Sequence, residues 1–166
     1  NFDGVNYGWD ATSTNPSTVW ELGTPSFGLT SSSFSAPDCW DINLATGYQS
    51  SANATLTSPI FDFTSTNDAR LKFYINYNTE ASWDGVRCEY RSIDTVWHLL
   101  GAVGSPGSIN WYNTPNLISS NWPGWAGTSG GWQPCEYDSL NMLNGSNSVQ
   151  FRFIFTSDVS INVDGF

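Results

Sequence analysis

Apolar and polar side chains alternate with a period of two in residues 70–77 (RLKFYINY), 86–91 (VRCEYR) and 148–158 (SVQFRFIFTSD). This period is the pattern of a β-strand with one buried face and one exposed face. In the second segment the alternation places Cys88 on the apolar face, where a free cysteine behaves as a small hydrophobic residue. In the third segment it places a row of phenylalanines on one face, so we expect that strand to contribute to the core.

Two further strands are predicted at residues 54–63 and 94–103, and Pro59 interrupts the first of them, which suits an edge strand or a bend. Loops rich in Gly, Ser, Asn and Pro separate the strands, and only residues 138–145 suggest a short helical turn. Short alternating strands with long polar loops predict an all-β fold, an antiparallel sandwich of two sheets. The chain has no internal repeat, linker or charge run, so we expect one domain over residues 1–166.

Composition narrows the range of partners. Only 12 % of the residues are charged and 16 % are aromatic, which is typical of a secreted or cell-surface β-protein. Five basic against fifteen acidic residues give a formal charge of -10, which repels phosphate backbones and argues against nucleic acid. No apolar run approaches the length of a membrane-spanning helix, so we expect no membrane insertion. The chain also starts abruptly and ends in a strand-like stretch, so we expect a piece of a longer exported protein with neighbouring domains.

The three cysteines leave one unpaired if a disulfide forms. Cys39 and Cys135 both lie close to a proline in loop-like sequence, so they are the better candidates for a bridge. Three free thiols are the alternative, and the sequence does not decide between the two.

Acidic residues in loops are the candidate metal ligands. Glu80 and Asp84 flank Trp83 in the loop between two predicted strands, and Asp3, Asp158 and Asp164 are further acidic loop positions. Calcium prefers several oxygen ligands, which loops at strand ends supply easily. None of these acids forms a D-x-D-x-D-G loop, so spacing alone gives the metal site less weight than ordinary loop acids.

A catalytic role for Glu80 and Asp84 is a weaker interpretation. A glycoside hydrolase needs two carboxylates that face each other across the sugar bond, and no predicted strand carries an acidic pair at even spacing. The single histidine, His98, has no nucleophilic residue near it in sequence. We therefore expect no catalytic residues.

Tryptophans are the candidate ligand-binding residues. Trp111, Trp122 and Trp125 lie in a loop-rich region with Trp132, and Trp83 lies between the two loop acids. Flat rings beside Asn and Asp stack on sugar faces in carbohydrate-binding surfaces. Tryptophan in long loops also closes the end of a sandwich core, and this alternative is somewhat favoured by the sequence.

The order of motifs resembles the MAM-like jelly-roll domains of secreted bacterial proteins. These domains occur beside peptidases of the immune-inhibitor-A type and in large surface proteins of Bacteroidetes. The resemblance covers nearly the whole chain and rests on WELGTPS (20–26), the block 40–48, SPIFDF (58–63), E…WDG (80–85), NWYN (110–113) and RFIFTSD (152–158).

This resemblance implies a jelly-roll sandwich without catalytic machinery, often with structural calcium. It implies metal-ligand positions at Asp3, Glu80, Asp84 and Asp158. The family continues after its GF motif into an acidic end strand that helps to complete a cation site, whereas this sequence ends at Phe166. A site that uses Asp3 would then lack its partner, and the last strand would be missing or supplied elsewhere.

Taken together, the sequence predicts a non-catalytic extracellular module for adhesion, with a glycan or a surface protein as partner and calcium as a structural ion. The first alternative is a structural spacer or peptidase-associated domain with no ligand of its own. The second is a glycoside hydrolase that uses Glu80 and Asp84.

Overall fold

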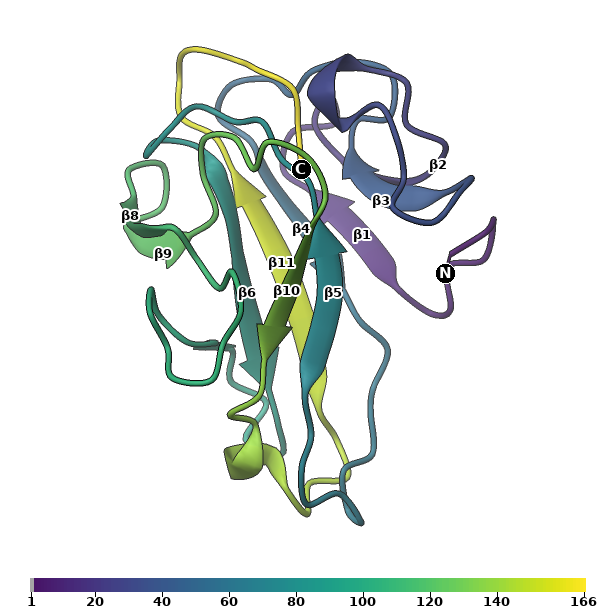
Figure 1. Cartoon of the computed structure of the whole chain (residues 1–166), viewed down its shortest axis with the longest axis vertical. Helices are drawn as coiled ribbons and strands as arrows, with labels where there is room; N and C mark the ends of the chain where they lie inside the picture. The colour runs from purple at the N-terminus through teal and green to yellow at the C-terminus, as the bar shows by residue number, and fades with distance from the viewer. Residues whose placement is uncertain (1) are drawn as a thin grey trace.

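The computed structural model describes residues 2–166 as short antiparallel strands joined by long loops (Figure 1). Its largest sheet has five strands in the order β1-β4-β11-β6-β7. These strands are β1 (Asp10–Ser13), β4 (Asn53–Thr57), β11 (Gln150–Thr156), β6 (Gly85–Arg91) and β7 (His98–Leu99).

Three two-stranded pairs complete the described part of the chain. They are β2 (Trp20–Gly23) with β3 (Cys39–Ile42), β5 (Leu71–Ile75) with β10 (Gln133–Tyr137), and β8 (Thr114–Leu117) with β9 (Trp122–Gly124). The helical segments in this part are two single 3₁₀ turns, η1 (Gly28–Thr30) and η2 (Asn141–Leu143). All pairings are antiparallel, so the predicted all-β antiparallel class is confirmed.

An aromatic core fills the space between the five-stranded sheet and the β5–β10 pair, which lies in front of that sheet in Figure 1. The ring of Phe73 on β5 meets the ring of Phe153 on β11 edge to face, with 5.0 Å between their centroids. Apolar side chains alternate inward along β11 as the sequence predicts, and Cys88 on β6 is fully buried. Two layers of strands therefore share one core, in the manner of a sandwich.

Trp111 and Trp125 belong to this core, which contradicts the expectation that they bind a ligand. Their side chains are 2 % and 1 % exposed, and each ring contacts Phe73. Each indole N–H is satisfied by a backbone carbonyl, that of Leu100 for Trp111 and that of Asn110 for Trp125. The long loops fold inward here because burying large rings outweighs solvation once the N–H groups have partners.

The predicted disulfide between Cys39 and Cys135 is not formed, because all three cysteines are free. Cys39 begins β3, whereas Cys135 lies opposite Phe73 in the β10–β5 pair. The two residues belong to different strand pairs, and Cys135 points into the core, where it is 1 % exposed. Proximity to proline was therefore a poor guide to their pairing.

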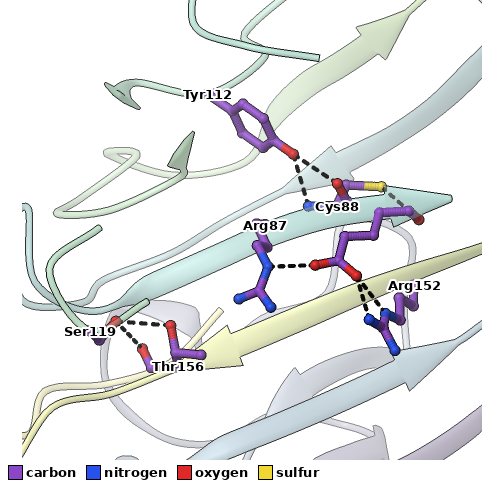
Figure 2. A network of polar contacts seen from close by, with 7 residues as sticks. Arg87, Cys88, Tyr112, Ser119, Arg152 and Thr156 are labelled. Atoms are coloured by element: carbon purple, nitrogen blue, oxygen red, sulfur yellow. Dashed lines mark hydrogen bonds and ion pairs between the residues drawn. The ribbon is translucent and has the colours of Figure 1, made fainter. Parts of the chain in front are cut away.

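A polar network covers the other face of β6 and β11 (Figure 2). Glu89 accepts hydrogen bonds from Arg87 at 2.7 Å and from Arg152 Nε at 2.8 Å, and the Arg152 guanidinium lies 4.2 Å from the centre of the Trp97 ring. Tyr112 joins a loop to β6, because its hydroxyl accepts the N–H of Cys88 and donates to the carbonyl of the same residue. The Glu89–Arg152 pair ties the two central strands together on the side away from the core, whereas the Tyr112 ring packs among the core aromatics.

A hollow of about 480 Å³ separates β3 from β5. Among the described residues, β3 pairs only with β2, and β5 pairs only with β10. Trp40, Phe73 and Tyr74 line this hollow together with Phe34, whose ring stacks on Tyr74 with 3.4 Å between centroids. We call this space the aromatic hollow.

The C-terminal segment, residues 164–166, lies between the ends of β3 and β5. Asn78 donates its backbone N–H to the carbonyl of Gly165 and accepts the N–H of Asp164. On the other side, the N–H of Ile42 donates to the carbonyl of Phe166. The segment therefore bridges the two strand pairs at one end of the molecule.

Candidate metal centre

A tight loop between β5 and β6 brings Glu80 and Asp84 together. The carbonyl of Glu80 accepts the backbone N–H groups of Trp83 and Asp84, and Ser82 adopts a positive φ of 66° within the turn. The Thr79 hydroxyl donates to the carbonyl of Asp84 at 2.9 Å and so closes the base of the loop. This turn places two residues four positions apart side by side, and β6 begins directly after it.

Asp158 reaches the same place from the end of β11. Its backbone N–H donates to Oδ1 of Asp84 at 2.8 Å. The side chains of Glu80, Asp84 and Asp158 each offer one oxygen, and these three oxygens lie within 4.8 Å of one another. We call this group the acidic triad. It sits at the upper end of the molecule in Figure 1, where the loop after β11 passes the loop between β5 and β6.

Two oxygens of the acidic triad are buried without a hydrogen-bond partner. They are Oδ2 of Asp84, whose side chain is fully buried, and Oε2 of Glu80. None of the ion pairs within residues 2–166 involves a member of the triad. Buried carboxylates without a counter-charge are unfavourable, so they are neutralised by protons or by a cation.

The pKa of Asp84 is raised to about 6, chiefly by burial; the charges of Asp158 and Glu80 also raise it, whereas the Asp158 N–H and the Tyr48 hydroxyl lower it. The pKa of Glu80 is also raised, by desolvation first and by the charge of Asp158 second. Raised pKa values are expected for buried acids that have no cation beside them. A divalent ion among the three would reverse the balance and keep all of them ionised.

Tyr48 is a member of this site that the sequence analysis missed. Its side chain is fully buried, and its hydroxyl accepts the backbone N–H of Glu80 at 3.1 Å. It lies 32 positions before Glu80 in the chain, so no local pattern in the sequence connects the two residues.

Asp3 is not part of the acidic triad, although it was expected to share its metal site. It follows Phe2, whose ring contacts Trp9 and Trp40 in the N-terminal region. The packing of Phe2 therefore fixes Asp3 beside the β2–β3 side of the molecule, and the other three predicted ligands converge without it.

Two of the four tryptophans proposed as ligand-binding residues are exposed near the acidic triad. Trp83 is 40 % exposed and lies within the loop that carries Glu80 and Asp84, and Trp122 on β9 is 48 % exposed. The β8–β9 region contacts the Trp83 loop, because Ser119 donates its backbone N–H to the carbonyl of Trp83 at 3.0 Å. Oxygen ligands and exposed aromatic rings therefore share one end of the molecule.

Comparison with known proteins gave no matching family model and no significantly similar curated protein. Within residues 2–166 no helix has the length and apolar character that crossing a membrane requires. The geometry of this end of the molecule is therefore the basis for assigning a function.

Proposed function

We propose that the chain is a non-catalytic extracellular module with the jelly-roll form of a β-sandwich, and that it binds a glycan or a surface protein. A calcium ion held by Glu80, Asp84 and Asp158 would fix the binding loops. The observation that carries this proposal is the convergence of three carboxylates from two loops, with buried and unpartnered oxygens on Glu80 and Asp84.

Calcium fits this site because the donors are all oxygens. Calcium takes several carboxylate and carbonyl oxygens in a flexible arrangement, whereas zinc and copper favour histidine and thiolate ligands. The group contains no histidine or cysteine. An ion here would join the loop before β6 to the loop after β11, which limits the freedom of both loops.

The exposed rings of Trp83 and Trp122 are the proposed contact surface. Aromatic rings present apolar faces to sugars and to apolar side chains at little entropic cost, because they have few rotatable bonds. Ile118 is 45 % exposed in the same region, and its backbone N–H donates to the carbonyl of Ser82 in the Trp83 loop. The proposed ion would hold this surface in one conformation.

Burial argues against a hydrolytic role for the acidic triad. A catalytic carboxylate must contact its substrate, but the Asp84 side chain has no exposed surface. Two hollows of the described structure, one beside β3 and β5 and one beside His98 and Met142, are lined by other residues. These features favour a structural role for Asp84 over general acid or base chemistry.

A glycan array and protein pull-downs, each with calcium and with EDTA, test the proposal. We expect a ligand that binds in calcium, binds weakly in EDTA, and loses most of its affinity in Trp83→Ala and Trp122→Ala. Ile93→Ala is the control, because Ile93 is 74 % exposed in the turn between β6 and β7. A well-folded, calcium-loaded sample that binds no ligand would favour the structural-spacer alternative, and release of reducing sugar abolished by Glu80→Gln would favour the hydrolase.

A further inference from the structure

Asp41 on β3 and Asp164 in the C-terminal segment form a second pair of buried carboxylates. Their side chains are 3 % and 4 % exposed. Neither takes part in an ion pair within the described residues. Neither belongs to the acidic triad, so the pair is a separate feature of the fold.

Thr30, at the end of η1, lies beside both carboxyl groups. Its hydroxyl donates to Oδ1 of Asp164 at 3.4 Å, and it also interacts with the carboxyl group of Asp41, whose pKa it lowers. Asp164 further accepts the backbone N–H groups of Leu29 and Thr30. The Asp164 carboxylate is therefore held in place by η1, and the Thr30 hydroxyl reaches both acids.

The Asp41 carboxyl group is the unsatisfied member of the pair. Its Oδ1 is buried and has no hydrogen-bond partner. A Cβ atom placed on Gly165 would lie 3.2 Å from this oxygen and 2.8 Å from the carbonyl oxygen of Ile42. Oδ1 therefore points toward the C-terminal segment, on the same side of Gly165 as a backbone carbonyl oxygen.

The pKa of Asp41 is raised to about 8, chiefly by burial and in smaller part by the charge of Asp164. The backbone N–H groups of Ile42 and Phe166 lower it, but they do not offset the burial. A carboxyl group in this position is neutralised either by a proton or by a cation. The variant Asp41→Asn distinguishes the two states. Asn resembles the protonated acid, so it can replace a carboxyl group that is neutralised by a proton. Asn cannot bind a cation with the same strength, so it cannot replace a carboxylate that is neutralised by an ion.

We propose that Asp41, Asp164 and Thr30 form a second cation site, which binds a hard divalent ion, calcium by the chemistry of its donors. Two carboxylates, a hydroxyl and a nearby carbonyl oxygen are the donor types that calcium prefers. The proposal does not depend on an ion at the acidic triad.

An ion at this site would join β3, η1 and the C-terminal segment. The loop that follows η1 covers the aromatic hollow, since Phe34 stacks on Tyr74 and the indole N–H of Trp132 donates to the carbonyl of Ser32 at 2.9 Å. The ion would therefore hold the cover of the hollow in place, and its removal would change the environment of Trp132.

Counting bound ions in matched variants tests the proposal. The parent chain, Asp41→Asn, Asp84→Asn and the exposed control Asp10→Asn are each equilibrated with calcium chloride, and bound calcium is counted by native mass spectrometry. We expect one ion fewer in Asp41→Asn than in the parent, the same count in Asp10→Asn, and a melting temperature in EDTA for Asp41→Asn no lower than that of the parent. An unchanged ion count in Asp41→Asn would overturn the proposal.

The result for Asp84→Asn is read separately, because loss of an ion there tests only the acidic triad. Anomalous diffraction from parent crystals soaked in terbium chloride gives a measurement without any variant, in case Asp41→Asn does not fold. A terbium peak between Asp41 and Asp164 is the expected result. A peak at the acidic triad alone, or no peak at all, would overturn the second site.

Discussion

At the scale of single residues, the Asp84 carboxylate is the most buried ligand of the proposed calcium site. We expect Asp84→Asn to lose one calcium ion, because Asn keeps the acceptor for the Asp158 N–H but removes the charge. At calcium concentrations about 100 times Kd, one ion stabilises the folded state by about 2.7 kcal/mol, which is about 5–10 °C in melting temperature for a domain of this size. Differential scanning calorimetry in calcium and in EDTA measures this gain, and Asp10→Asn should keep it. A full gain in Asp84→Asn would contradict the assignment.

The free thiols give a second prediction at this scale. Burial raises the pKa of all three thiols, but Cys88 and Cys135 are buried, whereas Cys39 is only partly buried. Thiolates are the reactive form, so we expect Cys88 and Cys135 to react with a thiol reagent only after unfolding. Denatured protein should react at three cysteines without prior reduction. Two thiols that appear only after reduction would restore the predicted disulfide.

At the scale of elements, Glu89 on β6 joins that strand to β11 through Arg152, and it also pairs with Arg87 on its own strand (Figure 2). Glu89 is 7 % exposed, so its removal leaves two partly buried arginines without a counter-charge. We expect Glu89→Ala to lower the free energy of unfolding by about 2–3 kcal/mol, somewhat less than for a fully buried pair. Urea unfolding measures the change. Asp68→Ala, which removes an exposed pair with Arg70, should change it by less than about 0.5 kcal/mol.

Sequence patterns predicted the strands with long alternation and missed the short ones. Residues 70–77 and 148–158 contain β5 and β11, and the predicted break at Pro59 lies two positions after the end of β4. The strands β8 and β9 have four and three residues, so they present too few positions for a period of two to be recognised. Their pairing depends on contacts made by the loops around them, which a local pattern does not contain.

The candidate site was also predicted only in part, because a local pattern connects only residues that lie close together in the sequence. Glu80 and Asp84 flank one turn, so their proximity follows from local sequence, and Asp158 joined them through the family resemblance. Asp3 was placed by the same resemblance, but the packing of Phe2 against Trp9 and Trp40 holds it elsewhere.

At the scale of the whole molecule, pH should control the effect of calcium. The pKa of Asp84 is about 6 in the folded state, against an ordinary value of 3.8. Without calcium, the folded state therefore binds more protons than the unfolded state between these two pH values. The free energy of unfolding then falls as pH rises through this window. Calcium requires the ionised form, so its affinity should be about tenfold weaker at pH 5 than at pH 7.5. Isothermal titration with calcium chloride at the two pH values measures the ratio. An affinity independent of pH would mean that Asp84 is not a ligand.

Calcium binding by the acidic triad is best tested by the calcium content and the melting temperature of the purified chain, measured in calcium and again after EDTA. We expect stoichiometric calcium, its loss in EDTA and a fall of several degrees in melting temperature. A chain that holds no calcium and melts at the same temperature in both buffers would contradict this expectation, because the three carboxylates at the loop end would then be neutralised by protons alone.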